Sequence, residues 1–245
     1  MIDTTPLKDS MGAQIEAFAK PLVDAGYTVF VPDYRLAPRF THPASLHDIQ
    51  RAVRFVRFNA KQFGIDPDRI GGVGFAAGGY LVSMAGLLDS KPTGDDPSPV
   101  GQVSARLQCV VSGGTATNLA ENAKVEETNA YMSGFIGDVI TPDISPNSDM
   151  YKALLEVSPV SHVAAGAPPF LLIHAEQDQE MPIKNAEAFQ QALEKVGTPV
   201  KLIRVPNSNH QRTWGQKENA AVWASPMVQW MDQYLKRKAT TTSTR

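Results

Sequence analysis

Five glycines lie among the nine residues of Gly71–Gly79, directly before the apolar stretch Tyr80–Leu88. Within this run, Gly74–Gly78 reads Gly-Phe-Ala-Ala-Gly and has the glycine spacing of a G-x-S-x-G segment. The glycines leave room for a sharp turn from a strand into a helix, and the turn exposes its central residue at the top of the sheet. We therefore expect a strand–turn–helix unit with residue 76 at its tip. Ala76 keeps this turn but supplies no hydroxyl group.

The rest of the chain alternates short apolar runs with longer amphipathic stretches. We expect strands at Tyr27–Val31, Arg69–Phe75, Leu107–Ser112, Phe170–His174 and Val200–Val205. We expect helices at Gly12–Ala25, Pro43–Phe63, Tyr80–Leu88, Ala186–Val196 and Asn219–Arg237. Strands that alternate with helices favour a mostly parallel sheet covered by helices on both faces. The length of 245 residues fits one such α/β domain over residues 1–245.

The stretch Gly113–Pro159 interrupts this alternation. Its apolar residues stand between polar ones, and they are Leu119, Tyr131, Met132, Phe135 and Ile136. Long connections at the carboxyl edge of a parallel sheet are where ligand pockets are built. We expect residues 113–159 to form a cap-like insertion over residue 76, with these five side chains lining an apolar acyl or alcohol pocket. A surface-packed helical excursion with no ligand role is the alternative.

Two further polar loops follow predicted strands. Asp178 comes after the strand at Phe170–His174, and His210 comes after the strand at Val200–Val205. The nucleophile position, the acid and the base thus occur in the order 76, 178 and 210, which is the order of α/β-hydrolases. We expect Asp178 to contact His210. We also expect the Cβ atom of Ala76 to lie within about 4–5 Å of a His210 ring nitrogen, because a serine there needs to reach its base.

At these residues the chain resembles the carboxylesterase families related to hormone-sensitive lipase and to bacterial feruloyl and acetyl esterases. The segments that carry the resemblance are Val31–Pro38 (VPDYRLAP), Phe63–Ile70 (FGIDPDRI), Ser158–Pro159 and Ala167–Pro169. It runs from about residue 12 to about residue 235, which is almost the whole chain. The resemblance implies an α/β-hydrolase fold and the hydrolysis of short-chain or aryl carboxylic esters.

The resemblance also implies roles for individual residues. Asp178 takes the place of the acid and His210 that of the base in a Ser-Asp-His triad, while the N–H of Ala77 is an oxyanion-hole donor. His174 matches a structural histidine of these families. The chain departs from the pattern at Ala76, which stands where the serine would be. It also shows no HGGG-type loop before its first helix, so the fold reads as N-terminally shortened. We expect an esterase scaffold that is inactive as written.

Two other functions stay open. The first is a natural non-catalytic relative that binds a ligand or a protein. The second is dinucleotide binding, because Gly72–Ala77 fits the pattern G-x-G-x-x-G/A and Asp89 follows downstream. That fingerprint needs a full strand before its first glycine, and the turn at Asp66–Asp68 leaves too little chain for one. Dinucleotide binding would also leave Asp178 and His210 without a role.

Composition restricts the remaining classes. The net charge of −2 creates no field that would attract nucleic acid or anionic lipid. The single cysteine, Cys109, excludes an internal disulfide, and no apolar run reaches the length of a membrane span. The first residues lack the pattern of a signal peptide, which predicts a cytoplasmic location. We expect no cofactor, no metal and a small-molecule ester as partner, and a homodimer stays open.

Overall fold

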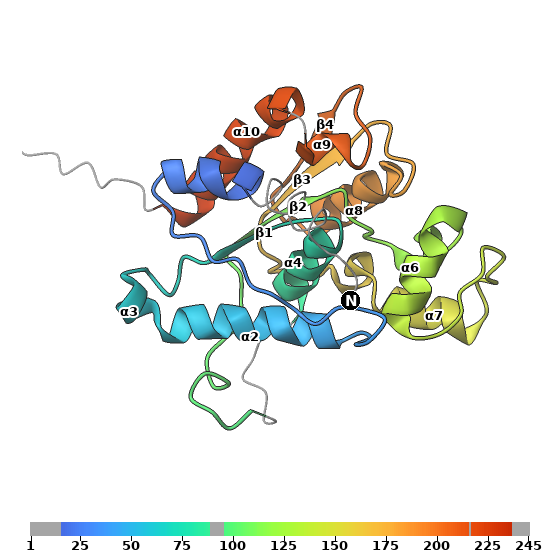
Figure 1. Cartoon of the computed structure of the whole chain (residues 1–245), viewed down its shortest axis with the longest axis horizontal. Coiled ribbons are helices and arrows are strands. Elements are labelled where there is room, and N and C mark those ends of the chain that lie inside the picture. The colour runs from blue at the N-terminus through green and yellow to red at the C-terminus, as the bar shows by residue number, and fades with distance from the viewer. Residues whose placement is uncertain (1–15, 89–95, 216, 237–245) are drawn as a thin grey trace, which may run out of the picture.

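The computed structural model describes residues 16–88, 96–215 and 217–236 and is built around a parallel sheet (Figure 1). Its strands are β1 (Gly71–Phe75), β2 (Cys109–Gly113), β3 (Phe170–Ala175) and β4 (Val200–Val205). They lie in the order β1-β2-β3-β4, and every neighbouring pair is parallel. The carboxyl ends of all four strands therefore meet at one edge of the sheet. The predicted parallel sheet is confirmed.

The side chains of the central strands alternate between two buried layers. Val110 of β2 and Leu172 of β3 enter one layer, whereas Val111 and Leu171 enter the other. Every residue of β2 and β3 is buried. A strand that is covered on both faces needs apolar side chains in both directions, which is why these strands read as continuous apolar runs in the sequence.

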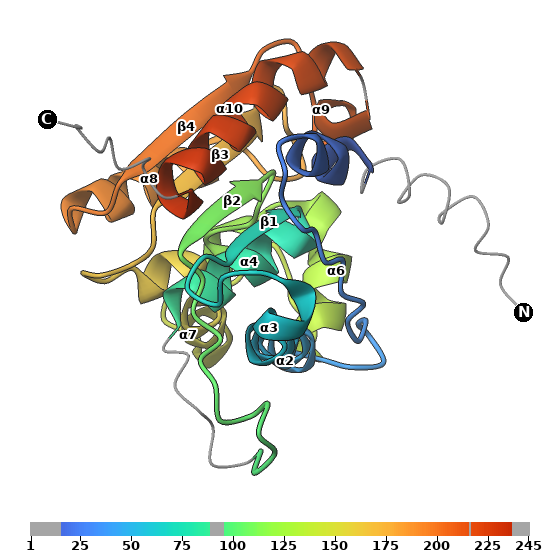
Figure 2. The same cartoon turned by 90° about the vertical axis from the view of Figure 1, so that its left-hand side faces the viewer.

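Helices cover both faces of the sheet, as the sequence predicts (Figure 2). One face carries α10 (Lys217–Leu235), which contributes Trp223 and Met227, and the helix at residues 16–24, which contributes Leu22. The helices α2 (Ala44–Phe58), α4 (Ala77–Leu87) and α8 (Lys184–Lys195) cover the other face. Two further helices are short: α3 (Ala60–Phe63) follows α2 in the chain, and α9 (Arg212–Gly215) precedes α10.

The predicted insertion at residues 113–159 folds into helices on the α4 side of the sheet. These are α5 (Leu119–Asn122), α6 (Glu126–Ile136) and α7 (Asp149–Glu156), and the 3₁₀ helix η1 (Pro159–His162) follows. Their buried residues Leu119, Met132 and Leu154 belong to the same core cluster as Leu81 of α4. The insertion is therefore joined to the main core and does not form a separate layer.

Two predicted elements are wrong. Tyr27–Val31 has no strand assignment, because no described strand runs beside it to accept and donate ladder hydrogen bonds. The predicted helix Pro43–Phe63 is divided at Asn59, whose side-chain amide donates to the Phe55 carbonyl at 2.8 Å. A side chain that bonds to the backbone of the preceding turn competes with the continuing helix. Residues 12–15, Asp89 and Arg237, which also carried predictions, lie outside the described residues.

Candidate active site

Ala76 is the single residue between β1 and α4. Its backbone has φ 49° and ψ −117°, a positive-φ conformation that residues other than glycine rarely adopt. Two hydrogen bonds hold this conformation: the N–H of Ala76 donates to the Gly113 carbonyl at 2.8 Å, and the N–H of Tyr80 donates to the Ala76 carbonyl at 2.9 Å. The backbone thus turns sharply at residue 76, as the glycine spacing predicts.

The glycines around Ala76 are required by close packing. A Cβ atom on Gly74 would lie 2.3 Å from the backbone of Gly78, where the turn folds back on itself. A Cβ atom on Gly79 would lie 2.0 Å from the hydroxyl oxygen of Thr115. These approaches are far inside van der Waals contact, so only glycine lets β1 and α4 meet at this angle.

Asp178 and His210 come from the loops that follow the neighbouring strands β3 and β4. The His210 Nδ1 atom lies 2.7 Å from the Asp178 Oδ2 atom, so the predicted contact is present. A carboxylate only accepts, so Nδ1 carries the proton of this hydrogen bond. In the neutral imidazole, Nε2 therefore keeps its lone pair and can accept a proton from a neighbouring group.

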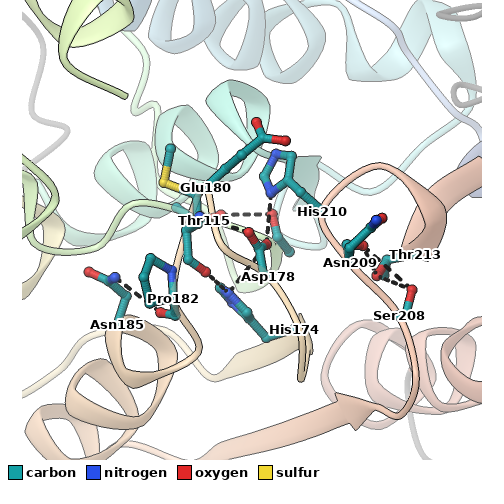
Figure 3. A network of polar contacts seen from close by, with 12 residues as sticks. Thr115, His174, Asp178, Glu180, Pro182, Asn185, Ser208, Asn209, His210 and Thr213 are labelled. Atoms are coloured by element: carbon teal, nitrogen blue, oxygen red, sulfur yellow. Dashed lines mark hydrogen bonds and ion pairs between the residues drawn. The ribbon is translucent and has the colours of Figure 1, made fainter. Parts of the chain in front are cut away.

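The Asp178 carboxylate is held on its other side as well (Figure 3). Its Oδ1 atom accepts from the backbone N–H of Met181 at 2.7 Å, and the Met181 carbonyl lies 2.6 Å from the His174 Nε2 atom. A carbonyl only accepts, so His174 donates from Nε2. Burial lowers the pKa of His174, which keeps its ring neutral. His174 thus positions the loop that carries Asp178, in agreement with the structural role that the resemblance implies.

The imidazole of His210 packs on the residue before Ala76. The ring centroids of Phe75 and His210 are 4.8 Å apart, and their planes are tilted by 37°. Gly114, which has φ 51°, lies close to both rings: an added Cβ would come 2.4 Å from the Phe75 ring and 3.3 Å from the His210 Cε1 atom. These contacts bring His210 to the turn at residue 76. The expected distance between Ala76 Cβ and the ring nitrogen stays a prediction.

Ala77 is the first residue of α4. The N–H groups at the start of a helix have no carbonyl partner within the helix, so the N–H of Ala77 is open to an external acceptor. A carbonyl oxygen placed above the turn would also meet the positive end of the helix dipole. The position suits the oxyanion-hole donor that the resemblance implies.

A cavity of about 340 Å³ opens beside His210. Its lining residues are mostly amides, and they are Gln177, Gln179, Glu180, Asn209, His210 and Gln211. None of the five predicted pocket residues lines it. Leu119 and Met132 are buried in the core, Phe135 and Ile136 are half-buried against it, and Tyr131 is exposed. The apolar pocket therefore stays a prediction, and the cavity that is present is polar.

Sequence reasoning missed several residues of this site. Phe75 and Gly114 support the His210 ring, and Glu180 lines the cavity beside it. The Gly-Gly pair that ends β2 was a usable signal, because a glycine at a strand end often marks a close approach. Nothing in the sequence pattern singled out Phe75 or Glu180. The role of Phe75 depends on its contact with His210, which is more than a hundred residues away, and that of Glu180 depends on the shape of its loop.

Among the described residues, no group of three histidine, cysteine or acidic side chains is arranged to hold a metal ion. None of the described helices combines the length and the apolar character needed to cross a bilayer.

A protein-family model described as BD-FAE matches residues 7–193 of the chain. Esterase LipQ of Mycobacterium tuberculosis (strain ATCC 25618 / H37Rv) is 29% identical over 191 residues, which are 77% of this chain and 44% of LipQ. An arylesterase of Saccharolobus solfataricus is 29% identical over 194 residues, which are 75% of this chain and 57% of the arylesterase. The chain thus spans about half the length of these relatives.

Solved structures agree with the family match. An acetyl ester-xyloside bifunctional hydrolase from Caldicellulosiruptor lactoaceticus has a TM-score of 0.75 and 30% identity, over 87% of this chain and 74% of that one. A thermophilic esterase from the Planctomycetes species Thermogutta terrifontis shares the fold at a TM-score of 0.63 and 22% identity, over 84% of this chain and 71% of that one. The chain belongs to the BD-FAE family, and its fold is that of an α/β-hydrolase carboxylesterase.

Proposed function

We propose that this protein is a carboxylic ester hydrolase scaffold for short-chain or aryl esters, with residues 76, 178 and 210 as its catalytic positions and with Ala76 in the place of the nucleophile. The observation that carries the proposal is the 2.7 Å hydrogen bond between His210 and Asp178, on loops that leave neighbouring parallel strands. A buried carboxylate that orients an imidazole beside a strained strand–helix turn is the arrangement that activates a serine hydroxyl.

With serine at residue 76, the proposed roles are as follows. His210 takes the hydroxyl proton on Nε2 as the serine oxygen attacks the ester carbonyl, and later gives the proton to the leaving alcohol. Asp178 holds the Nδ1 proton and stabilises the positive ring. The N–H of Ala77 donates to the oxygen that becomes negative in the tetrahedral intermediate. Water then hydrolyses the acyl-enzyme by the same proton transfers.

As written, the chain has no hydroxyl at the turn, and we propose that it is inactive toward esters. The serines closest to the site in the sequence support this proposal. Ser83 and Ser112 are buried and hydrogen-bonded to each other at 3.0 Å, and Ser208 is buried and lies 3.0 Å from the Thr213 hydroxyl. A buried hydroxyl that is already hydrogen-bonded does not reach a substrate in the cavity.

The test is to restore the nucleophile. In Ala76→Ser, hydrolysis of a short-chain aryl ester such as para-nitrophenyl acetate is expected, whereas the unchanged chain is expected to give only the background rate. Loss of the nucleophile from a comparable triad costs roughly a million-fold in rate. If Ala76→Ser folds and hydrolyses no ester of this kind, the esterase proposal is wrong.

A natural non-catalytic relative is the second candidate, and Ala76 is the observation that favours it. Such a protein keeps the cavity at His210 for binding and makes no use of the triad chemistry. The two candidates differ in what Asp178→Asn does: it abolishes the activity of an Ala76→Ser esterase, but it leaves ligand binding by a non-catalytic relative nearly unchanged.

A further inference from the structure

Among the described residues that line the cavity beside His210, Glu180 is the one with an acidic side chain. Its backbone is fixed, because the loop from Asp178 to Met181 is closed by the 2.7 Å bond between these two residues and the Asn122 amide lies 3.5 Å from the Glu180 carbonyl. The Glu180 side chain is half-buried. Its position at the cavity therefore follows from the same loop that presents Asp178 to the imidazole.

No basic side chain in the described part of the chain pairs with the Glu180 carboxylate. It makes no ion pair or hydrogen bond with any residue in the described part of the chain, and no lysine or arginine lines the cavity. The neighbouring basic residues Lys184 and Arg212 are absent from the lining. The other lining residues are four neutral amides and His210. Glu180 is thus the acidic group of a described lining that has no basic side chain besides the imidazole.

The Glu180 side chain also extends toward the reactive end of the imidazole. In Figure 3 it points to the side of the His210 ring that is away from the Asp178 carboxylate, and both residues line the same cavity. Nδ1 faces Asp178, so this side is that of Nε2. In the proposed reaction, Nε2 delivers its proton to the leaving alcohol. A charge on the alcohol part of an ester would therefore be placed in the field of Glu180.

We propose that Glu180 is a specificity-determining residue that makes this cavity prefer esters with a positively charged alcohol part and disfavour esters with a negatively charged one. This inference rests on the proposed function for the orientation of the ester. Opposite charges at a partly exposed site attract and like charges repel by modest amounts. We expect a preference of about fivefold to twentyfold between a cationic and an anionic alcohol of equal shape.

The first test uses the protein with Ala76, which is expected to bind esters without cleaving them. The probes are para-trimethylammoniophenyl acetate, para-tert-butylphenyl acetate and para-carboxyphenyl acetate, which share one ester and differ in charge. Dissociation constants are measured by NMR titration at about pH 8, where an ordinary histidine is neutral. The cationic probe is expected to bind most tightly and the anionic probe most weakly. The preference is expected to shrink at about 0.5 M salt, since salt screens exposed charges.

The matched variants are Glu180→Gln and Glu176→Gln. Glu176 lies on the same loop but is exposed and does not line the cavity. Glu180→Gln is expected to bring the ratio of cationic to anionic affinity close to one, while Glu176→Gln keeps the ratio of the unchanged protein. An unchanged ratio in Glu180→Gln, equal binding of all three probes by the unchanged protein, or no binding of any probe overturns the proposal.

The second test uses Ala76→Ser and the values of kcat/KM for the same three esters, each divided by the rate constant of the ester with hydroxide. In Ala76→Ser, this corrected kcat/KM is expected to be highest for the cationic ester and lowest for the anionic one. When Glu180→Gln is added, the three corrected values are expected to become nearly equal. An equal loss for all three esters would assign Glu180 to the general chemistry and overturn the specificity role. If Ala76→Ser is inactive but the binding preference is present, the esterase proposal fails and the charge selection by Glu180 stands.

Discussion

Phe75 and His210 lie ring against ring, with their centroids 4.8 Å apart, although 135 positions separate them in the chain. Phe75 is the last residue of β1, and Ala76 follows it directly. Residue 76 therefore directly follows the residue that packs on the His210 imidazole, whose Nδ1 atom is bonded to Asp178. The arrangement therefore predicts that a serine hydroxyl at residue 76 would become reactive.

Ala76→Ser is expected to be labelled by a fluorophosphonate probe, whereas the unchanged chain is expected to remain unlabelled. The reason is that the proposed function makes His210 the base and Asp178 its orienting acid, and their hydrogen bond is already formed, so only the nucleophile is added. Labelling is measured by intact-protein mass spectrometry. In Ala76→Ser with His210→Ala, the labelling rate is expected to fall at least about a thousandfold. Equal labelling with and without His210 would show that the imidazole does not activate residue 76.

Gly74→Ala is expected to lower the free energy of unfolding by about 1–3 kcal/mol, because its Cβ would lie 2.3 Å from the Gly78 backbone. Gly78→Ala is the matched control, since a Cβ at Gly78 meets no atom within 4 Å. Gly78 also lies in the first turn of α4, where alanine is the better helix former. Urea unfolding measures both changes. Equal stability of the two variants contradicts the tight turn.

Met132→Ala and Tyr131→Ala compare the contributions of the buried and the exposed side of α6 to the unfolding free energy. Met132 is 6% exposed and packs in the core, while Tyr131 is 78% exposed. Met132→Ala is expected to cost about 2–5 kcal/mol of unfolding free energy, because it leaves a cavity. Tyr131→Ala is expected to change the unfolding free energy by at most about 0.5 kcal/mol. A large loss in Tyr131→Ala would mean that α6 packs differently.

The buried ring of His174 is expected to make the folded protein less stable in weak acid. Burial lowers its pKa in the folded protein, so below about pH 6.5 the unfolded chain binds a proton that the folded chain does not. The contribution of His174 is fully present above about pH 6.5 and is lost as the pH falls, at up to about 1.4 kcal/mol per pH unit.

The measurement is the melting temperature between about pH 5 and pH 7.5. His174→Gln replaces the ring by an amide that can donate to the Met181 carbonyl and does not titrate. Its melting temperature is expected to fall less steeply with pH than that of the unchanged protein. His47→Gln, at an exposed position of α2, is the control and is expected to keep the original slope. A control slope as shallow as that of His174→Gln contradicts the assignment.

Local patterns were sufficient for much of the fold. The apolar runs of β2, β3 and β4 and the glycines around Ala76 predict their elements because burial on both faces and a sharp turn each demand particular residue types. The pairing of Asp178 with His210 was predicted from their places after two apolar strands, from the α/β-hydrolase order 76, 178 and 210, and from the family resemblance. The segment Tyr27–Val31 shows the limit, since its β-type composition fits a strand but a strand needs a partner.

The details of the site depended on contacts between distant parts of the chain. Phe75 and Gly114 support His210 only because β1, β2 and the loop after β4 converge at one edge of the sheet. The apolar residues of the insertion gave no sign of whether they face a pocket or the core, and the structure places Leu119 and Met132 in the core. The sequence records which side chains are apolar or charged. Which of them share a cavity, as Glu180 and His210 do, is set by packing across the whole fold, because packing alone fixes the direction in which each loop presents its side chains.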